Sequence, residues 1–127
     1  MKKLSWLAVI LVLVGAAGWG QNTVGTGQWL HEFWLSSQKV DSTSNPGWPD
    51  VTGQGKYIVF VAGSANVMAD ADWLNMGNTT WGQWCAVVGK YLDANPEQWN
   101  LEAQILVYRA LYVAWPGSKD PPYGYKQ

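Results

Sequence analysis

The chain has 127 residues, of which 48% are hydrophobic and only 13% are charged, and its formal net charge is −1. This charged share is about half of that in an average soluble domain. The single arginine, Arg109, and the lack of any basic run exclude nucleic acid as a partner, because binding phosphates requires clustered Lys and Arg.

Residues 1–20 have the three parts of a secretory signal peptide: a basic start at Lys2 and Lys3, an uncharged run, and small residues before the cut. Cleavage is expected after Ala17 or after Gly20. The alternative is an uncleaved anchor, which is disfavoured because the uncharged run 4–20 is short for a hydrocarbon core of about 30 Å. We therefore expect export to the periplasm, with no membrane attachment after cleavage.

The remainder is expected to be one small domain over residues 21–119, followed by a flexible tail at 120–127. Eight of the ten tryptophans stay in this part, because only Trp6 and Trp19 precede it. Exported domains of this size often contain disulfides, but Cys85 is the only cysteine, so no internal disulfide can form. Buried aromatic side chains can supply stability instead, because each removes a large apolar area from water.

The first predicted helix covers residues 28–38, where Trp29, Leu30, Phe33 and Trp34 have the spacing of a helical face. Residues 40–55 are rich in Ser, Gly, Pro, Asp and Thr, and we expect a long loop there. Residues 57–68 have strand composition, but their length and their apolar spacing of four, four and three favour a buried helix. That spacing is set by Tyr57, Val61, Ala65 and Met68.

The third helix is expected over 80–95, because Thr80 and Gln83 form the pattern of a capping box. Asn95-Pro96 ends it, and a fourth helix is expected to begin near Pro96 and to stop at Trp115-Pro116-Gly117. The apolar stripe expected on the fourth helix is Leu101, Ile105, Tyr108, Tyr112 and Trp115. These elements predict an all-α domain of four helices.

Residues suited to catalysis are scarce. His31 is the single histidine, and one His with one Cys gives no zinc-ligand pattern, so we expect no metal, no cofactor and no enzymatic activity. Asp70 and Asp72 could hold calcium or act as an acid–base pair, but further oxygen ligands are missing and a solvated helix end is favoured. Cys85 has three interpretations: a buried small apolar residue, an intermolecular thiol joining two copies in a homodimer, or a nucleophile that would need His31 as its base.

The tryptophans in or beside loops are Trp48, Trp73 and Trp99, and periodicity does not predict their burial. They either fold back onto the core or remain exposed. Exposed tryptophans are typical of protein interfaces and of platforms for sugar rings.

Residues 81–97, WGQWCAVVGKYLDANPE, resemble a motif of the Rap/Tai immunity protein family, and residues 56–62 and 27–30 are similar to two further segments of it. The match covers about two thirds of the mature chain. The family's usual cysteines are missing, with Trp34 and Gly117 at two of the positions where they are expected.

The resemblance implies a small helical periplasmic protein that binds and blocks peptidoglycan-cleaving amidase effectors delivered by type VI secretion. We expect the loop from about Asp70 to Thr79 to enter the cleft of such an effector, with Asp70, Asp72, Trp73 and Asn75 facing outward as the partner-binding residues. The alternative function is a glycan- or peptidoglycan-binding module that uses Trp48, Trp73 or Trp99.

Overall fold

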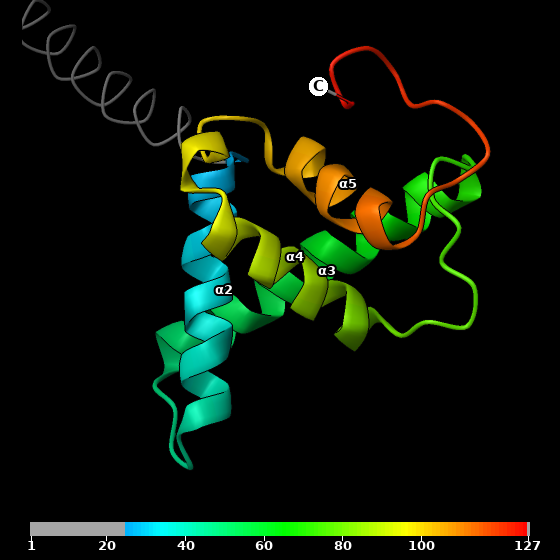
Figure 1. The fold of residues 1–127 in the computed structure, drawn as a ribbon. Helices are drawn as coiled ribbons and strands as arrows, with labels where there is room; N and C mark the ends of the chain where they lie inside the picture. Colours follow the sequence, from blue (N-terminus) through cyan, green and yellow to red (C-terminus); the bar gives the residue numbers. More distant parts are fainter. Residues whose placement is uncertain (1–24, 127) are drawn as a thin grey trace, which may run out of the picture.

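The computed structural model describes residues 25–126, and the expected signal peptide at 1–20 lies outside the described residues. The elements in chain order are α2 (Gly27–Ser42), α3 (Trp48–Asp70), α4 (Trp81–Ala94), the short 3-10 helix η1 (Pro96–Gln98) and α5 (Ala103–Ala114). This part of the chain holds no strand, only two isolated bridges, so the all-α prediction is confirmed. Figure 1 shows α4 crossing in front of α3, with α5 beside α4 and the tail returning toward α5.

The core lies where α3, α4 and α5 meet, and α2 packs most extensively on α3. The predicted face of α3 is confirmed, because Tyr57, Val61, Ala65 and Met68 are all buried. Tyr57 also donates a hydrogen bond from its hydroxyl to the Cys85 carbonyl oxygen over 2.7 Å, which ties α3 to α4 inside the core.

The helix predicted over 80–95 is confirmed as α4, and its capping box is complete. The Gln83 side chain accepts from the Thr80 backbone N–H at 2.8 Å, and the Thr80 hydroxyl accepts from the Gln83 N–H at 3.3 Å. Both bonds satisfy N–H groups that the helix itself leaves without partners.

The prediction of a long loop over 40–55 is wrong, because α2 continues to Ser42 and α3 begins at Trp48. Pro49 lies in the first turn of α3, where its fixed φ suits a helix and its missing N–H is not needed. Asp50 lies at the positive end of the helix dipole, and the Thr52 hydroxyl donates to the Trp48 carbonyl at 2.6 Å. The polar composition of this stretch therefore belongs to the start of a helix, and only residues 43–47 form the loop.

The fourth helix does not run continuously from Pro96. η1 is followed by a break, and α5 begins at Ala103. The break serves two other helices: Trp99 Nε1 donates to the Leu92 carbonyl at the end of α4, and the Trp99 and Leu101 carbonyls accept from the first N–H groups of α2. The buried face of α5 consequently differs from the predicted stripe and consists of Ala103, Leu106, Val107, Tyr108, Ala110 and Leu111.

Candidate functional site

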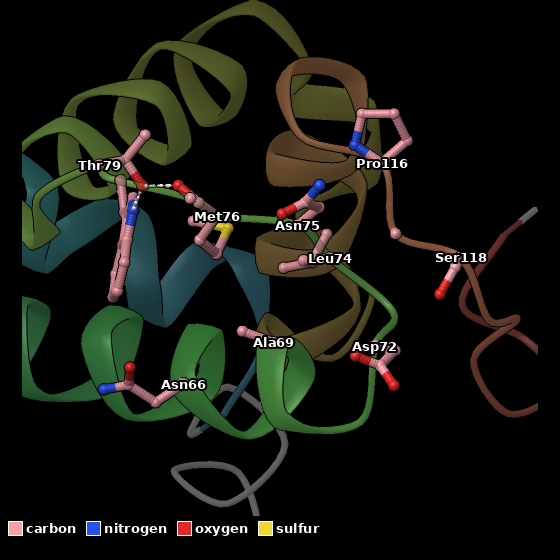
Figure 2. Close-up of a pocket in the computed structure, with 12 residues that line it drawn as sticks. Asn66, Ala69, Asp72, Leu74, Asn75, Met76, Thr79, Pro116 and Ser118 are labelled. Carbon is pink, nitrogen blue, oxygen red and sulfur yellow. Dashed lines mark hydrogen bonds between the residues drawn. The ribbon is translucent and has the colours of Figure 1, made fainter.

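An open groove of about 770 Å³ lies between the end of α3, the loop 71–80 and residues 116–118. We call it the α3–α4 groove. Figure 2 shows that Asn66 and Ala69 line it from α3, whereas Pro116 and Ser118 line it from the chain that follows α5. The groove thus forms where the loop that the sequence singled out meets a segment about forty residues further along the chain.

Backbone pairing fixes the loop beside the groove. The N–H of Asn75 donates to the Trp115 carbonyl at 3.0 Å, and the N–H of Gly117 donates to the Trp73 carbonyl at 3.0 Å. Leu74 and Pro116 lie opposite each other in this antiparallel bridge. Leu74 and Met76 are buried in the core, at 2% and 6% exposure, so the loop is held by packing as well as by hydrogen bonds.

Gly117 is required by this arrangement. A Cβ atom at this position would lie 2.2 Å from the Asp72 carbonyl oxygen and 2.5 Å from the Leu74 nitrogen. Both neighbours are backbone atoms that cannot swing aside, so any side chain at 117 would displace the loop. The sequence predicted only a helix stop at 115–117, and it gave no signal that this stop forms a wall of the groove.

The far end of the groove is closed by Thr79 and Trp84. Trp84 Nε1 donates to the Thr79 hydroxyl at 2.6 Å, and that hydroxyl donates to the Met76 carbonyl, as the dashed lines in Figure 2 show. Trp84 is 9% exposed. Its indole is therefore part of the core, and its polar edge anchors the loop.

The four predicted partner-binding residues are not equivalent. Asp72 and Asn75 are exposed and line the groove, and Asp70 is exposed at the adjoining end of α3. Trp73 is only partly exposed and packs against the core and against the Tyr125 ring, with centroids 5.6 Å apart. The three polar side chains are thus available to a partner at the loop surface, whereas Trp73 mainly packs beneath the loop.

Asp72 has the unusual backbone of a tight turn. Its φ is +62°, in the left-handed region that Asp and Asn tolerate better than most residues. Its carboxylate lies 3.5 Å from Lys119 Nζ, and both side chains are more than half exposed. Such an exposed pair contributes little stability, so the turn is shaped by the backbone bonds rather than by this ion pair.

Cys85 lies in the core at 8% exposure. Burial raises the pKa of its thiol to about 11, which leaves little of the reactive thiolate near neutral pH. A disulfide with a second copy would therefore require the core to open, and the geometry favours the interpretation of Cys85 as a buried apolar residue.

His31 does not face Cys85. Its Nε2 lies 2.9 Å from Asp93 Oδ1, and its ring stacks on Trp99 with centroids 4.1 Å apart. Trp34 Nε1 donates to the other oxygen of the same carboxylate at 3.0 Å. His31 thus takes part in a structural contact between α2 and α4.

The candidate tryptophans separate clearly in the structure. Trp48 is 76% exposed at the start of α3, whereas Trp99 is partly buried through its stacking on His31.

Within residues 25–126 no group of three or more His, Cys, Asp or Glu side chains is placed to hold a metal ion. None of the helices in the described range is long and apolar enough to cross a membrane.

Comparison with known proteins identifies a family for this chain. No curated protein matches the chain, but the family model of the Rap1a immunity proteins matches residues 28–117. The matched range begins in α2 and ends at Gly117, so it contains the whole helical core and both sides of the α3–α4 groove. We conclude that the chain belongs to the Rap1a immunity protein family.

Proposed function

We propose that this chain is a periplasmic immunity protein that binds a peptidoglycan amidase effector and blocks it sterically, without catalysis of its own. The observation that carries the proposal is the loop 70–79, which backbone hydrogen bonds and two buried side chains hold beside an open groove. Membership of an immunity protein family and the export signal expected at residues 1–20 support it.

A loop suits steric inhibition when it needs no ordering on binding, because ordering side chains and backbone opposes association. Here the backbone N–H groups of Asn75 and Gly117 bind across the loop, and Leu74 and Met76 anchor it from below. The exposed carboxylates of Asp70 and Asp72 and the amide of Asn75 can then reach donors in the effector cleft at low entropic cost.

The proposal is tested with peptidoglycan amidase effectors of the organism that carries this chain, each assayed for release of soluble fragments from purified peptidoglycan. We expect an equimolar amount of the chain to abolish release. The double variant Asp70→Arg/Asn75→Arg should weaken inhibition at least about tenfold, because like or unmatched charges at an interface cost several kcal/mol. Both side chains are exposed, and a positive charge at the C-terminal end of α3 interacts favourably with the helix dipole. The fold should therefore be retained.

The matched control is Asp41→Arg, which reverses a carboxylate in the last turn of α2, away from the groove. This substitution removes a 3.3 Å hydrogen bond that the Gln54 side chain donates to Asp41, and it should leave inhibition unchanged. Circular dichroism of all variants checks the fold. Equal inhibition by the groove variant and the control would refute the assignment of the loop, and no inhibition by the unaltered chain would refute the function.

The second candidate function, glycan binding, now rests on Trp48, because this side chain is 76% exposed whereas Trp73 and Trp99 pack against the core. Titration with soluble peptidoglycan fragments followed by tryptophan fluorescence tests it. A saturable change that disappears in Trp48→Ala supports glycan binding at this side chain, and the same change in both proteins counts against Trp48 as the site. No change with the unaltered chain refutes glycan binding.

A further inference from the structure

A second pocket lies between α4, α5 and the tail that follows α5, and it is separate from the α3–α4 groove. It has a volume of about 320 Å³ and is lined by Tyr91, Tyr108, Arg109, Tyr112, Val113 and Lys126. We call it the tail pocket, because Lys126 belongs to the tail that follows α5. The set contains two cationic side chains and three tyrosines, and it shares no residue with the α3–α4 groove.

Tyr108 lines this pocket, and its hydroxyl has no hydrogen-bond partner among the described residues. Tyr108 is 1% exposed, and its oxygen is the buried side-chain polar atom of residues 25–126 that makes no hydrogen bond. Buried hydroxyls are almost always paired, because an unpaired one loses its bonds to water. Burial also raises the pKa of this hydroxyl, so it stays protonated and can donate.

Arg109 has no ion-pair partner among residues 25–126. Its guanidinium donates to neutral oxygens: the Tyr125 carbonyl at 3.1 Å, the Gln98 side chain at 3.0 Å and the Gly124 carbonyl at 3.5 Å. The ion pairs among the described residues do not include it, although it is only partly exposed. A guanidinium has five N–H donors, so two remain for a ligand.

Lys126 adds a second positive charge at the rim. Its Nζ lies 5.5 Å from the centre of the Tyr112 ring and also contacts Asp120, which balances one of the two cations. Counting the described residues, the pocket therefore keeps one positive charge in excess, beside aromatic walls and an unused hydroxyl donor.

From this combination we propose that the tail pocket binds an organic carboxylate with an apolar or aromatic body, such as a peptide carboxyl end or a small organic acid. The carboxylate accepts from the Tyr108 hydroxyl and from Arg109, which pairs the buried donor and neutralises the excess charge. The Tyr91 and Tyr112 rings and Val113 contact the apolar body.

The site is tested with 3-phenylpropionate as a small acid and N-acetyl-alanyl-phenylalanine as a peptide end, each followed by NMR chemical shifts of the full folded chain. We expect saturable binding in the millimolar range, as for small ligands of this size. The neutral 3-phenylpropionamide should bind at least about tenfold more weakly, because a hydrogen bond to a charged group is stronger than one to a neutral group. The tighter of the two acids identifies the source of the carboxylate.

Tyr108→Phe removes only the hydroxyl and should weaken both acids about tenfold or more. The same substitution should leave the thermal midpoint of the free protein unchanged or raised, because the lost hydroxyl has no partner there. The matched control is Tyr123→Phe, since Tyr123 is 96% exposed and does not line this pocket. It should bind both acids as the unaltered chain does.

Lys126→Gln gives a second variant that is exposed and does not threaten the core. It should weaken the acids without changing binding of the amide, which separates charge from shape. The proposal is overturned if neither acid shows saturable binding at tens of millimolar, if the amide binds as tightly as the acids, or if Tyr108→Phe binds them like the unaltered chain.

Discussion

Replacing Gly89 by alanine is expected to destabilise the protein although Gly89 lies inside α4. In a helix interior, alanine is favoured over glycine by about 1 kcal/mol. At Gly89, however, the added Cβ would lie 2.3 Å from the Trp34 ring, where ordinary contacts begin at 3.4 Å. The indole would have to move away from α4 by about 1 Å, and overpacking of this kind costs about 1–3 kcal/mol.

The same movement threatens a hydrogen bond. Trp34 Nε1 donates to Asp93 Oδ2 at 3.0 Å, and a bond to a charged acceptor contributes about 1.5–3 kcal/mol when it is buried. Asp93 is 45% exposed, so the lower end applies. After the gain in helix propensity is subtracted from these two losses, the net loss is about 1.5–3.5 kcal/mol. Each kcal/mol lowers the melting temperature of a domain this size by about 4–8 °C.

The measurement is urea unfolding followed by far-ultraviolet circular dichroism, with Gly63→Ala as the matched control. Gly63 lies inside α3 with no atom within 4 Å of its virtual Cβ, so the same substitution should stabilise by about 0.5–1 kcal/mol. In a Trp34→Ala background the clash is absent, and Gly89→Ala should become stabilising as well. Equal effects of Gly89→Ala and Gly63→Ala in the unaltered chain would refute the proposed contact.

Three further outcomes are expected. Thr80→Ala removes the capping box and should lower the free energy of unfolding by about 1 kcal/mol in urea unfolding. Gly117→Ala should weaken the proposed inhibition of an amidase effector more than it lowers stability, because its Cβ would push the 72–74 backbone out of place, and unchanged inhibition would count against this geometry. The Cys85 pKa of about 11 in the fold exceeds the unfolded value of about 8.5, so between these pH values only the unfolded chain loses the proton and stability falls as pH rises. Unfolding at pH 7 and pH 10 should therefore show a loss about 1–2 kcal/mol smaller in Cys85→Ala than in the unaltered chain.

The sequence predicted those elements whose signals are local. The apolar spacing from Tyr57 to Met68 and the Thr80–Gln83 pair each depend on residues three or four positions apart. The structure confirms the buried face of α3 and the capping box of α4 that they predict. The start of α3 and the break before α5 could not be read in this way. The break is held by Gly27 and Gln28 of α2, whose N–H groups bind carbonyls more than seventy residues later.

The candidate site likewise has one part that local sequence predicts and one part that depends on distant segments. The loop was identified as the end of one helix and the start of the next, and its polar residues Asp72 and Asn75 do line the groove. The opposite wall, at Pro116 and Ser118, depends on pairing between distant segments, and the orientation of Trp73 depends on Tyr125. The tail pocket was not predicted because Tyr108 was interpreted as part of an apolar stripe, and only the structure shows that its hydroxyl is unpaired.

Trp34 and Gly117 stand where the family resemblance predicts cysteines, and the structure gives them opposite roles. Trp34 fills its position with a large ring that contacts Tyr57 on α3, Gly89 on α4 and the Asp93 carboxylate, so one side chain braces three helices. Gly117 fills its position with no side chain at all, and this absence lets the loop approach closely. Trp34 therefore stabilises the packing of the helices, whereas Gly117 shapes the groove. A folded Gly89→Ala protein should therefore still inhibit the effector, whereas a folded Gly117→Ala protein should not, and comparing the two separates stability from recognition.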